Sequence, residues 1–393
     1  MQTLVLADFF VPSLGGSIHW LLNTYSRYNT REVSFVAPRC HGDTIADKAL
    51  PFRVYRVSRM MGEWDPAVPM SFARYIEKIW YTYRICRKDH IEQIHCAKVF
   101  PEGFVAWCMQ CLSSIPYLIY AHGEEVQISL TSRKLAWLLP KIYNSAAAII
   151  ANSRNTKSLL ENIGVQSDKI YVIHPGVDPA SFNVEDDAIR LVRQRHNLGK
   201  SPVMLTVGRM QRRKGHDMVI KALPSIAQKA PDVKYLIVGT GEEQATLHKT
   251  AQDMGVLEKV VFAGQVPARE LAAYYAACDL FVMPNRQIGP DIEGFGIVFL
   301  EASAAGKPVI GGESGGTGDA ILHGVTGLRV DGTNVEAIAT AVTTLLTEPG
   351  LAKAMGSQGR CRVAAEFSWE MVVERTRMVA AQVKQRKSKK GVR

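Results

Sequence analysis

The sequence predicts an α/β fold made of two doubly wound domains, each built around a parallel β-sheet. Three observations support this prediction. Short apolar runs typical of buried strands alternate with longer helical runs along the chain. The alternation restarts after residue 200, and 393 residues are enough for two domains of ordinary size. We therefore expect two parallel-sheet domains in tandem, facing each other across a cleft.

The first half opens with a predicted strand at residues 4–7, and Gly15 and Gly16 follow it at the start of an amphipathic helix. Paired glycines directly after a first strand let a backbone approach a bulky or charged ligand closely. Further strands are predicted at residues 33–37, 91–97, 116–121 and 146–151, and helices at 70–88 and 102–112. His122 directly follows one of these strands, where open α/β sheets place ligand contacts, so it is a candidate site residue.

The domain boundary is predicted from a change in composition. A strand ends near residue 173 and is followed by a Pro175-Gly176 turn, and residues 184–200 are charged and favour a helix. We expect an N-terminal domain at residues 1–183, a link at 184–200 and a second domain at 201–370. Residues 371–393 are predicted to form a helix that packs back toward the first domain and ends in a basic tail.

The second half restarts with a predicted strand at residues 203–207, followed by Arg209 and, where the next helix opens, by Lys214. Two cations beside a strand end and a helix start would stabilise an anion. Arg212 and Arg213, which lie between them, are expected to face solvent. Later strands are predicted at 233–238, 260–263 and 280–283, with a helix at 268–278; the glycine-rich segment at 314–321 could lie close to bound phosphates.

Two carboxylates mark the stretch that follows the strand at 280–283. Glu301 is the one charge on a helix, predicted to begin near Phe295, that is otherwise apolar or small on every face. Burying an unpaired carboxylate costs several kcal/mol, so Glu301 should face a cleft or hold a ligand. Glu293 lies at the start of this helix, where free amides suit oxygen-rich ligands. The alternative for Glu293 is an ordinary helix-capping role.

These motifs together resemble glycosyltransferase family 4, a family of retaining enzymes with the GT-B fold of two Rossmann-like domains. The resemblance covers nearly the whole chain and rests on EGFGIVFLE (residues 293–301), Gly208-Arg209, Lys214-Gly215, Gly15-Gly16 and the turn at 175–178. Residues 289–303 are most similar to the subgroup of GDP-mannose-dependent phosphatidylinositol mannosyltransferases. His174-Pro175 departs from the family, in which an asparagine often precedes the Gly-Val-Asp turn.

The resemblance implies a role for each candidate residue. Arg209 and Lys214 would bind the donor diphosphate, and Glu301 would hold the ribose hydroxyls. Glu293 would hold the donor sugar, together with the backbone amides of Phe295, Gly296 and Ile297. Val266 would meet the base, His122 would lie near the sugar, and Gly15 and Gly16 would lie near the phosphates. The resemblance thus implies Glu293, His122, Arg209 and Lys214 as the catalytic group.

The expected chemistry is metal-independent transfer of a hexose, such as mannose, from a nucleotide-diphosphate sugar to a lipid-linked or glycan acceptor. No D-x-D motif offers a carboxylate pair to a metal, and no cofactor is expected beyond the substrate, GDP-mannose or a UDP-sugar. The absence of G-x-G-x-x-G after either first strand disfavours an ordinary dinucleotide oxidoreductase. A sugar-nucleotide epimerase of similar architecture and a non-catalytic nucleotide-binding module remain as alternatives.

Composition limits the partners and the compartment. The net charge is +10, and six basic groups lie in residues 384–393. The sequence contains no basic stripe with interleaved aromatics, so nucleic-acid binding is not predicted. Seven scattered cysteines and the lack of a basic leader predict a cytoplasmic protein with reduced thiols. The tail is read first as a solvated segment and secondly as a contact with anionic lipid on the inner face of the membrane, to which residues 74–88 could contribute. The alternative for that segment is an ordinary amphipathic face formed by Tyr75, Ile79, Tyr83 and Arg84.

Overall fold

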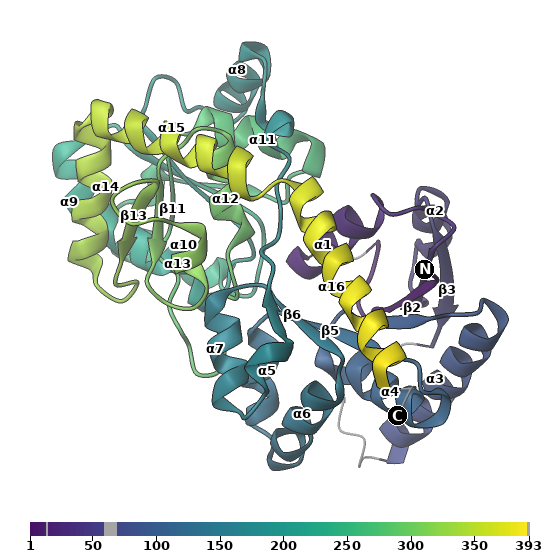
Figure 1. Ribbon diagram of the computed structural model, residues 1–393. Helices are drawn as coiled ribbons and strands as arrows, with labels where there is room; N and C mark the ends of the chain where they lie inside the picture. Colours follow the sequence, from purple (N-terminus) through teal and green to yellow (C-terminus); the bar gives the residue numbers. More distant parts are fainter. Residues whose placement is uncertain (13–14, 59–68, 391–393) are drawn as a thin grey trace. The chain divides into compact units, whose positions relative to one another are not determined.

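The computed structural model describes residues 1–12, 15–58 and 69–390, and the chain forms two compact units (Figure 1). Unit 1 comprises residues 1–175 and 369–393, and unit 2 comprises residues 176–368. The division at residue 176 precedes the segment 184–200. That segment contains helix α8 (Asp186–Arg195), which packs against α11 (Ala268–Ala277) within unit 2.

Unit 1 is built on a seven-stranded, fully parallel sheet with the order β3-β2-β1-β4-β5-β6-β7. Because the order reverses between β1 and β4, the carboxyl ends of these central strands mark the topological switch point. The strands are β1 (Thr3–Leu6), β2 (Val33–Pro38), β3 (Arg53–Val57), β4 (Gln93–Cys96), β5 (Tyr117–Ala121), β6 (Ala148–Ala151) and β7 (Ile170–Val172).

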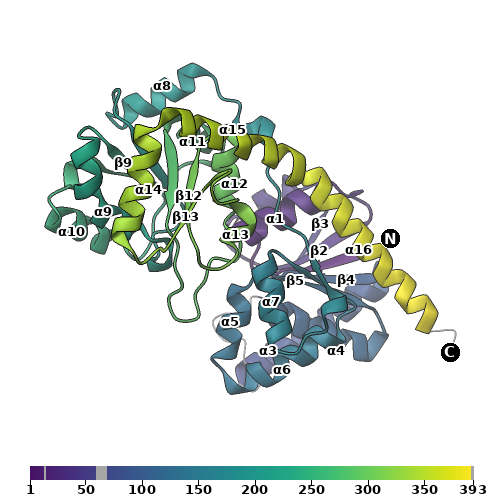
Figure 2. The same ribbon diagram turned by 60° about the vertical axis from the view of Figure 1, so that its left-hand side comes forward.

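Helices cover both faces of this sheet (Figure 2). The helices are α1 (Gly16–Tyr25), α2 (Asp43–Lys48), α3 (Pro69–Lys88), α4 (Phe104–Ser113), α5 (Glu124–Leu130), α6 (Arg133–Ser145), α7 (Arg154–Asn162) and α16 (Trp369–Lys390), with short turns at Val99–Gly103 and Ser167–Lys169. Helices α3, α4 and α6 share one apolar core with alternate strand residues. The C-terminal α16 returns to unit 1 and packs against α1, where the rings of His19 and Trp369 meet at 5.5 Å.

Unit 2 repeats the design with six parallel strands in the order β10-β9-β8-β11-β12-β13. Its strands are β8 (Val203–Val207), β9 (Lys234–Val238), β10 (Val260–Gly264), β11 (Leu280–Met283), β12 (Val309–Gly312) and β13 (Gly327–Val330). Its other helices are α9 (His216–Lys229), α10 (Gln244–Asp253), α12 (Ile297–Ala304), α13 (Thr317–Ala320), α14 (Val335–Thr347) and α15 (Pro349–Glu366), with short turns at Pro179–Phe182, Arg212–Lys214 and Leu257–Lys259. The switch point lies between β8 and β11.

The prediction of two parallel-sheet domains is confirmed. Strands β3, β12 and β13 were not predicted from the sequence. Strands β3 and β13 are edge strands, which pair with a neighbouring strand on one side only. Strand β12 is a run of four residues that ends in two glycines. Among the described residues no helix is both long and apolar enough to cross a bilayer.

Candidate functional site

The loops at the carboxyl ends of β8, β10, β11 and β12 hold the candidate residues of unit 2. Arg209 follows β8 and is exposed, and Lys214 ends the short turn that precedes α9. Val266 follows β10 and is half-buried. Glu293 lies in the loop between β11 and α12, so parallel strands bring these segments to one edge of the sheet.

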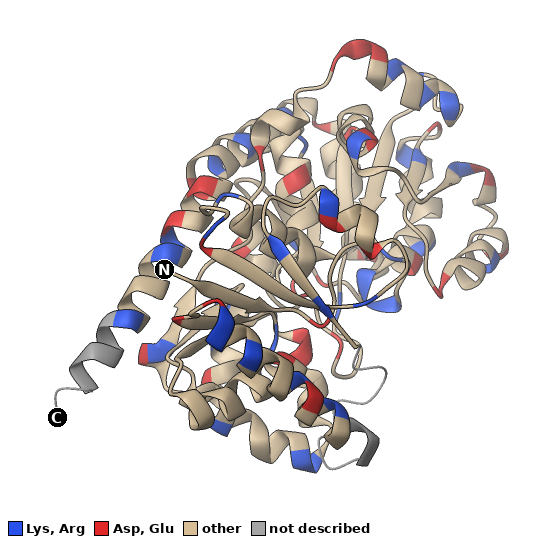
Figure 3. Cartoon of the chain, turned by 90° about the vertical axis from the view of Figure 1, so that its right-hand side faces the viewer, with Lys and Arg blue, Asp and Glu red and all other residues tan. Residues whose placement is uncertain are grey.

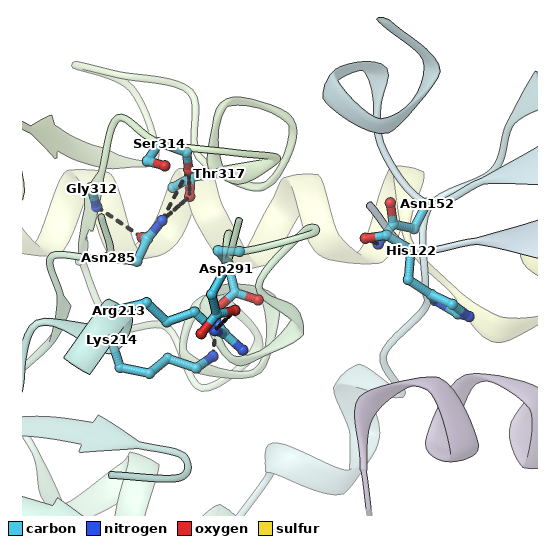
Figure 4. Close-up of polar contacts among 10 residues, drawn as sticks. His122, Asn152, Arg213, Lys214, Asn285, Asp291, Gly312, Ser314 and Thr317 are labelled. Atoms are coloured by element: carbon cyan, nitrogen blue, oxygen red, sulfur yellow. Dashed lines mark hydrogen bonds and ion pairs between the residues drawn. The ribbon is translucent and has the colours of Figure 1, made fainter. Parts of the chain in front are cut away.

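Glu293 is the centre of a buried ion cluster (Figure 4). Its Oε2 atom accepts hydrogen bonds from Lys214 Nζ at 2.5 Å and from Arg213 Nη1 at 2.7 Å. Arg213 also pairs with Asp291, at 2.8 Å between Nε and Oδ1. Two carboxylates therefore share two cations on the loops after β8 and β11.

The charges of the cluster fix its protonation. Burial alone would raise the pKa of Glu293, but the positive charges of Lys214 and Arg213 outweigh burial and lower that pKa to about 2. Burial lowers the pKa of Lys214, and the charge of Glu293 opposes this effect. Glu293 is consequently a carboxylate at neutral pH, and it accepts hydrogen bonds without donating any.

Arg213 corrects the expectation that it faces solvent. Its side chain is 7% exposed, whereas Arg212 is exposed as predicted. The tight turn Arg212–Lys214 points adjacent side chains in different directions, so one arginine enters the loop core while its neighbour leaves it. Three consecutive cations were the only sequence signal, and they did not show which one turns inward.

Helix α12 begins at Ile297, two residues after the predicted start near Phe295, and Gly296 caps it. The first amides of a helix have no acceptor inside it, and here the amide of Phe299 donates to the carbonyl oxygen of Gly296 at 3.0 Å. Glu293 itself bonds to cationic side chains rather than acting as a simple capping residue. Phe295 is buried and packs near Phe367, with ring centroids 6.1 Å apart.

Glu301 lies one turn farther along α12 and is half-buried. Its Oε2 atom accepts a 2.6 Å hydrogen bond from the hydroxyl of Tyr275 on α11. Burial raises the pKa of Glu301, and the hydrogen bond from Tyr275 opposes that rise. Tyr275 was not identified from the sequence because a tyrosine on an apolar helix face looks like any core residue.

His122 lies in unit 1, directly after β5. Its Nε2 atom donates to the carbonyl oxygen of Ala97 at 2.9 Å, and its backbone amide donates to Glu125 Oε1 at 2.7 Å. The side chain of Asn152 donates to the His122 carbonyl at 3.0 Å. Because Nε2 carries the proton in this arrangement, Nδ1 has a free lone pair that accepts hydrogen bonds.

Burial, helped by the charge of Lys98, lowers the pKa of His122 to about 4, so the ring is neutral near pH 7. The ring of Trp20, on α1, packs edge-on against that of His122 at 5.5 Å. Gly15 and Gly16 lie at the start of the same helix. Helix α1 therefore begins at the glycine pair and contacts His122 through the ring of Trp20.

The chain matches two family models. The model described as "Glycosyl transferases group 1" matches residues 189–362, and the model described as "Glycosyltransferase Family 4" matches residues 17–181. The first match lies within unit 2, and the second begins in unit 1 and ends at residue 181, just inside unit 2.

Curated relatives align with nearly the whole chain. A GDP-mannose-dependent alpha-(1-6)-phosphatidylinositol monomannoside mannosyltransferase of Mycolicibacterium smegmatis is 35% identical, over 93% of this chain and 94% of the relative. A GDP-mannose-dependent mannosyltransferase acting on monoacylated alpha-(1-6)-phosphatidylinositol monomannoside, from Corynebacterium glutamicum, is 30% identical over 95% and 96%, respectively.

Solved structures share the fold at lower identity. Anabaena HepE in complex with UDP and glucose superposes with a TM-score of 0.82 and 19% identity, over 97% of this chain and 100% of that one. Sucrose-phosphate synthase from Thermosynechococcus elongatus gives a TM-score of 0.78 and 23% identity, over 98% and 99%. At such identities the likeness shows the fold alone.

Proposed function

The chain belongs to glycosyltransferase family 4 and is a GT-B glycosyltransferase, and we propose that it transfers mannose from GDP-mannose to a hydroxyl of a lipid-linked or glycan acceptor. The observation that carries the proposed site is the cluster in which Arg213 and Lys214 hold Glu293 at the carboxyl edge of unit 2. The names of the relatives support mannose and a lipid acceptor. The epimerase alternative has no support among these relatives.

The cations have a defined task in this proposal. Breaking the glycosidic bond leaves growing negative charge on the nucleoside diphosphate. Arg209 and Lys214, with the first amides of α9, would stabilise that charge as groups already in place before the reaction, without a metal ion. Burial strengthens the effect of Lys214, because an ammonium in a low-dielectric site interacts more strongly with an anion.

The carboxylates would recognise hydroxyl groups. Glu293, which stays ionised, would accept hydrogen bonds from the donor sugar, and the nearby amides of Gly296 and Ile297 would donate to its oxygens. Glu301 would accept hydrogen bonds from the ribose, with Tyr275 fixing its orientation. Base contacts near Val266 and phosphate contacts at Gly15 and Gly16 belong to the same proposal.

His122 would act as a neutral hydrogen-bond acceptor. With its Nε2 proton donated to Ala97, its Nδ1 atom is suited to accept from a sugar hydroxyl. We propose retention of anomeric configuration by acceptor attack on the side that the diphosphate leaves, with a phosphate oxygen taking the acceptor proton. Double displacement through an enzyme carboxylate is the second route, as in retaining hydrolases.

A peripheral membrane contact belongs to the proposal as well, and α3 supports it. Phe72, Ile76, Trp80 and Tyr83 recur along the helix and are 57%, 53%, 50% and 40% exposed. The guanidinium of Arg84 lies over the Trp80 ring at 4.7 Å. Basic and aromatic side chains on one exposed helix suit an anionic interface.

Other residues of α3 support the alternative interpretation, in which the helix has an ordinary amphipathic face. Tyr75 is buried, and Ile79 packs against the core of unit 1, whereas Tyr83 and Arg84 are exposed, so only part of the predicted face is structural. Elsewhere, basic and acidic positions are interspersed along helices and loops (Figure 3). In the basic tail, the side chains beyond Lys384 lie outside the described residues, and the tail's lipid contact stays a proposal.

The experiment that tests the function is a donor and acceptor screen. The protein is incubated with labelled GDP-mannose, UDP-glucose or ADP-glucose, with and without a lipid acceptor fraction. We expect label to move from GDP-mannose into lipid only when the acceptor fraction is present. Donor interconversion without acceptor would instead identify an epimerase, and nucleotide binding without any turnover would identify a binding module.

Flotation with anionic vesicles tests the membrane contact. Replacing Phe72 and Trp80 by serine should reduce flotation, whereas the control Leu112→Ser, which alters a 64% exposed side chain on α4, should leave it unchanged. Equal flotation of both variants and the wild type would exclude this helix face.

A further inference from the structure

Asn285 lies in the loop after β11, and its side chain is 1% exposed. Its Nδ2 atom donates to the carbonyl oxygen of Ser314 and to Thr317 Oγ1, both at 3.0 Å. Its Oδ1 atom accepts from the backbone amide of Gly312 at 3.1 Å. Figure 4 shows these contacts converging on one carboxamide. The side chain thus joins the end of β12, the following loop and the start of α13.

The contacts are directional. One end of the carboxamide must donate, because it meets a carbonyl oxygen, and the other must accept, because it meets an N–H group. An aspartate of the same shape has no donor for the Ser314 carbonyl, and leucine has neither group. The position therefore requires an amide.

The segment 313–316, Glu-Ser-Gly-Gly, contains no apolar side chain that could anchor it by packing. Hydrogen bonds must set its position instead. On its other side, the amide of Gly316 donates to the carbonyl oxygen of Glu293 at 2.9 Å. Gly315 has a φ of +71°, and a Cβ atom there would lie 2.1 Å from the same oxygen. The loop is therefore held between Asn285 and the backbone of Glu293.

We propose that Asn285 is a positioning residue that fixes the glycine loop 313–316 against Glu293, and so sets the geometry in which the donor sugar and diphosphate bind. The proposal rests on the proposed function of Glu293. Asn285 acts through the loop and through Thr317, and it is assigned no contact with the reacting atoms. Loss of its carboxamide moves the loop backbone and with it the segment that carries Glu293.

Steady-state kinetics of Asn285→Asp test the proposal. We expect the KM for the nucleotide sugar to rise by about 10-fold or more, the range expected when a buried hydrogen bond to a partner is lost, with a smaller change in kcat. As the pH falls, the new buried carboxyl becomes protonated and regains one donor, so kcat/KM relative to wild type should recover. Unchanged kinetics at every pH would overturn the proposal.

Matched variants separate positioning from general stability. Thr317→Val removes a hydroxyl from the Asn285 network, and Thr317→Ser keeps it, so only the valine variant should raise KM. Thr206→Val removes a buried hydroxyl that bonds to Val282 and Tyr235 in the sheet of the same unit. It should lower stability and leave KM unchanged. A KM increase in Thr206→Val equal to that of Asn285→Asp would overturn the proposal.

Hydrogen exchange provides a readout that needs no donor. Amides of residues 312–317 should exchange faster in Asn285→Asp than in wild type or Thr206→Val, because the loop loses hydrogen bonds from the Asn285 carboxamide. Equal exchange rates in Asn285→Asp and the wild type would show that Asn285 does not hold the loop. Wild-type protein that transfers no sugar would overturn the proposed function instead, while the exchange result still decides whether Asn285 holds the loop.

Discussion

Lys214 donates a 2.5 Å hydrogen bond to Glu293, although 79 residues separate them in the sequence. The two residues come from the loops after β8 and β11, which are adjacent strands at the switch point of unit 2. The family resemblance implies that the lysine binds the diphosphate and the glutamate binds the sugar. With these proposed roles, their pairing would place the two halves of the donor on one electrostatic unit.

Lys214→Ala should lower turnover at least ~100-fold, because it removes one prepositioned charge from the leaving group. Glu293→Ala should have a similar effect. The double variant should lose less than the product of the two, since the residues act as a pair. Steady-state kinetics of the three variants measure this, with Arg212→Ala as the exposed neighbouring control. Near wild-type turnover in both single variants would exclude the assignment.

Arg213→Met should lower the free energy of unfolding by about 3 kcal/mol, because it leaves Glu293 and Asp291 with less compensation in a buried site. Arg212→Met, at the exposed neighbour, should change it by less than about 0.5 kcal/mol. Urea unfolding of both variants compares the two positions. Equal stability would contradict the burial of Arg213.

Glu301→Ala should abolish discrimination for the ribose hydroxyls. Wild-type protein should bind GDP about 10-fold or more tightly than 2′,3′-dideoxy-GDP, as a hydrogen bond to a charged group predicts, and the variant should bind the two alike. Tyr275→Phe should give an intermediate loss, since it frees the orientation of Glu301. Calorimetry with both nucleotides measures the difference, and full discrimination in Glu301→Ala would refute the ribose contact.

The low pKa of His122 predicts a pH-dependent loss of stability. In the unfolded chain the ring titrates near 6.5, and in the folded protein near 4. Between these values the unfolded state binds more protons, so the contribution of His122 is fully present above pH 6.5 and is lost as the pH falls toward 4. His122→Gln should show a shallower decline over this range.

Denaturant unfolding at pH 4, 5, 6 and 7 measures that difference. His95 and His216, whose pKa values burial lowers to about 3, add the same sign of slope to both proteins and cancel in the comparison. An identical pH slope for wild type and variant would show that His122 is not held neutral.

Much of the fold could be predicted because buried parallel strands are continuous apolar runs. The strand at residues 280–283 was predicted with the bounds that the structure has. Strand β3, RVYRV, was not predicted because two arginines interrupt its apolar pattern at the sheet edge. A continuous apolar run indicates a strand that is buried on both faces of the sheet. This signal is weak in an edge strand, which has one open side.

A candidate site residue could be predicted where burying its side chain in an apolar helix would cost free energy. Glu301 on an apolar helix is such a case, whereas Asn285 and Tyr275 are not, because their importance depends on partners 27 to 32 and 26 residues away, respectively. Arg213 and Arg212 differ only in the direction of their side chains. Such differences arise from three-dimensional packing and have no signature in a single sequence.

The return of α16 to unit 1 makes unit 2 an insertion between two pieces of the other unit. Residues 176–368 contain all six strands of their own sheet and leave and rejoin unit 1 at residues 175 and 369. A fragment ending at residue 175 would lack the helix whose Trp369, Val379 and Val383 are buried, and would expose an apolar face. Unit 2 can therefore be excised as one uninterrupted piece, whereas unit 1 must be reassembled from both ends of the chain.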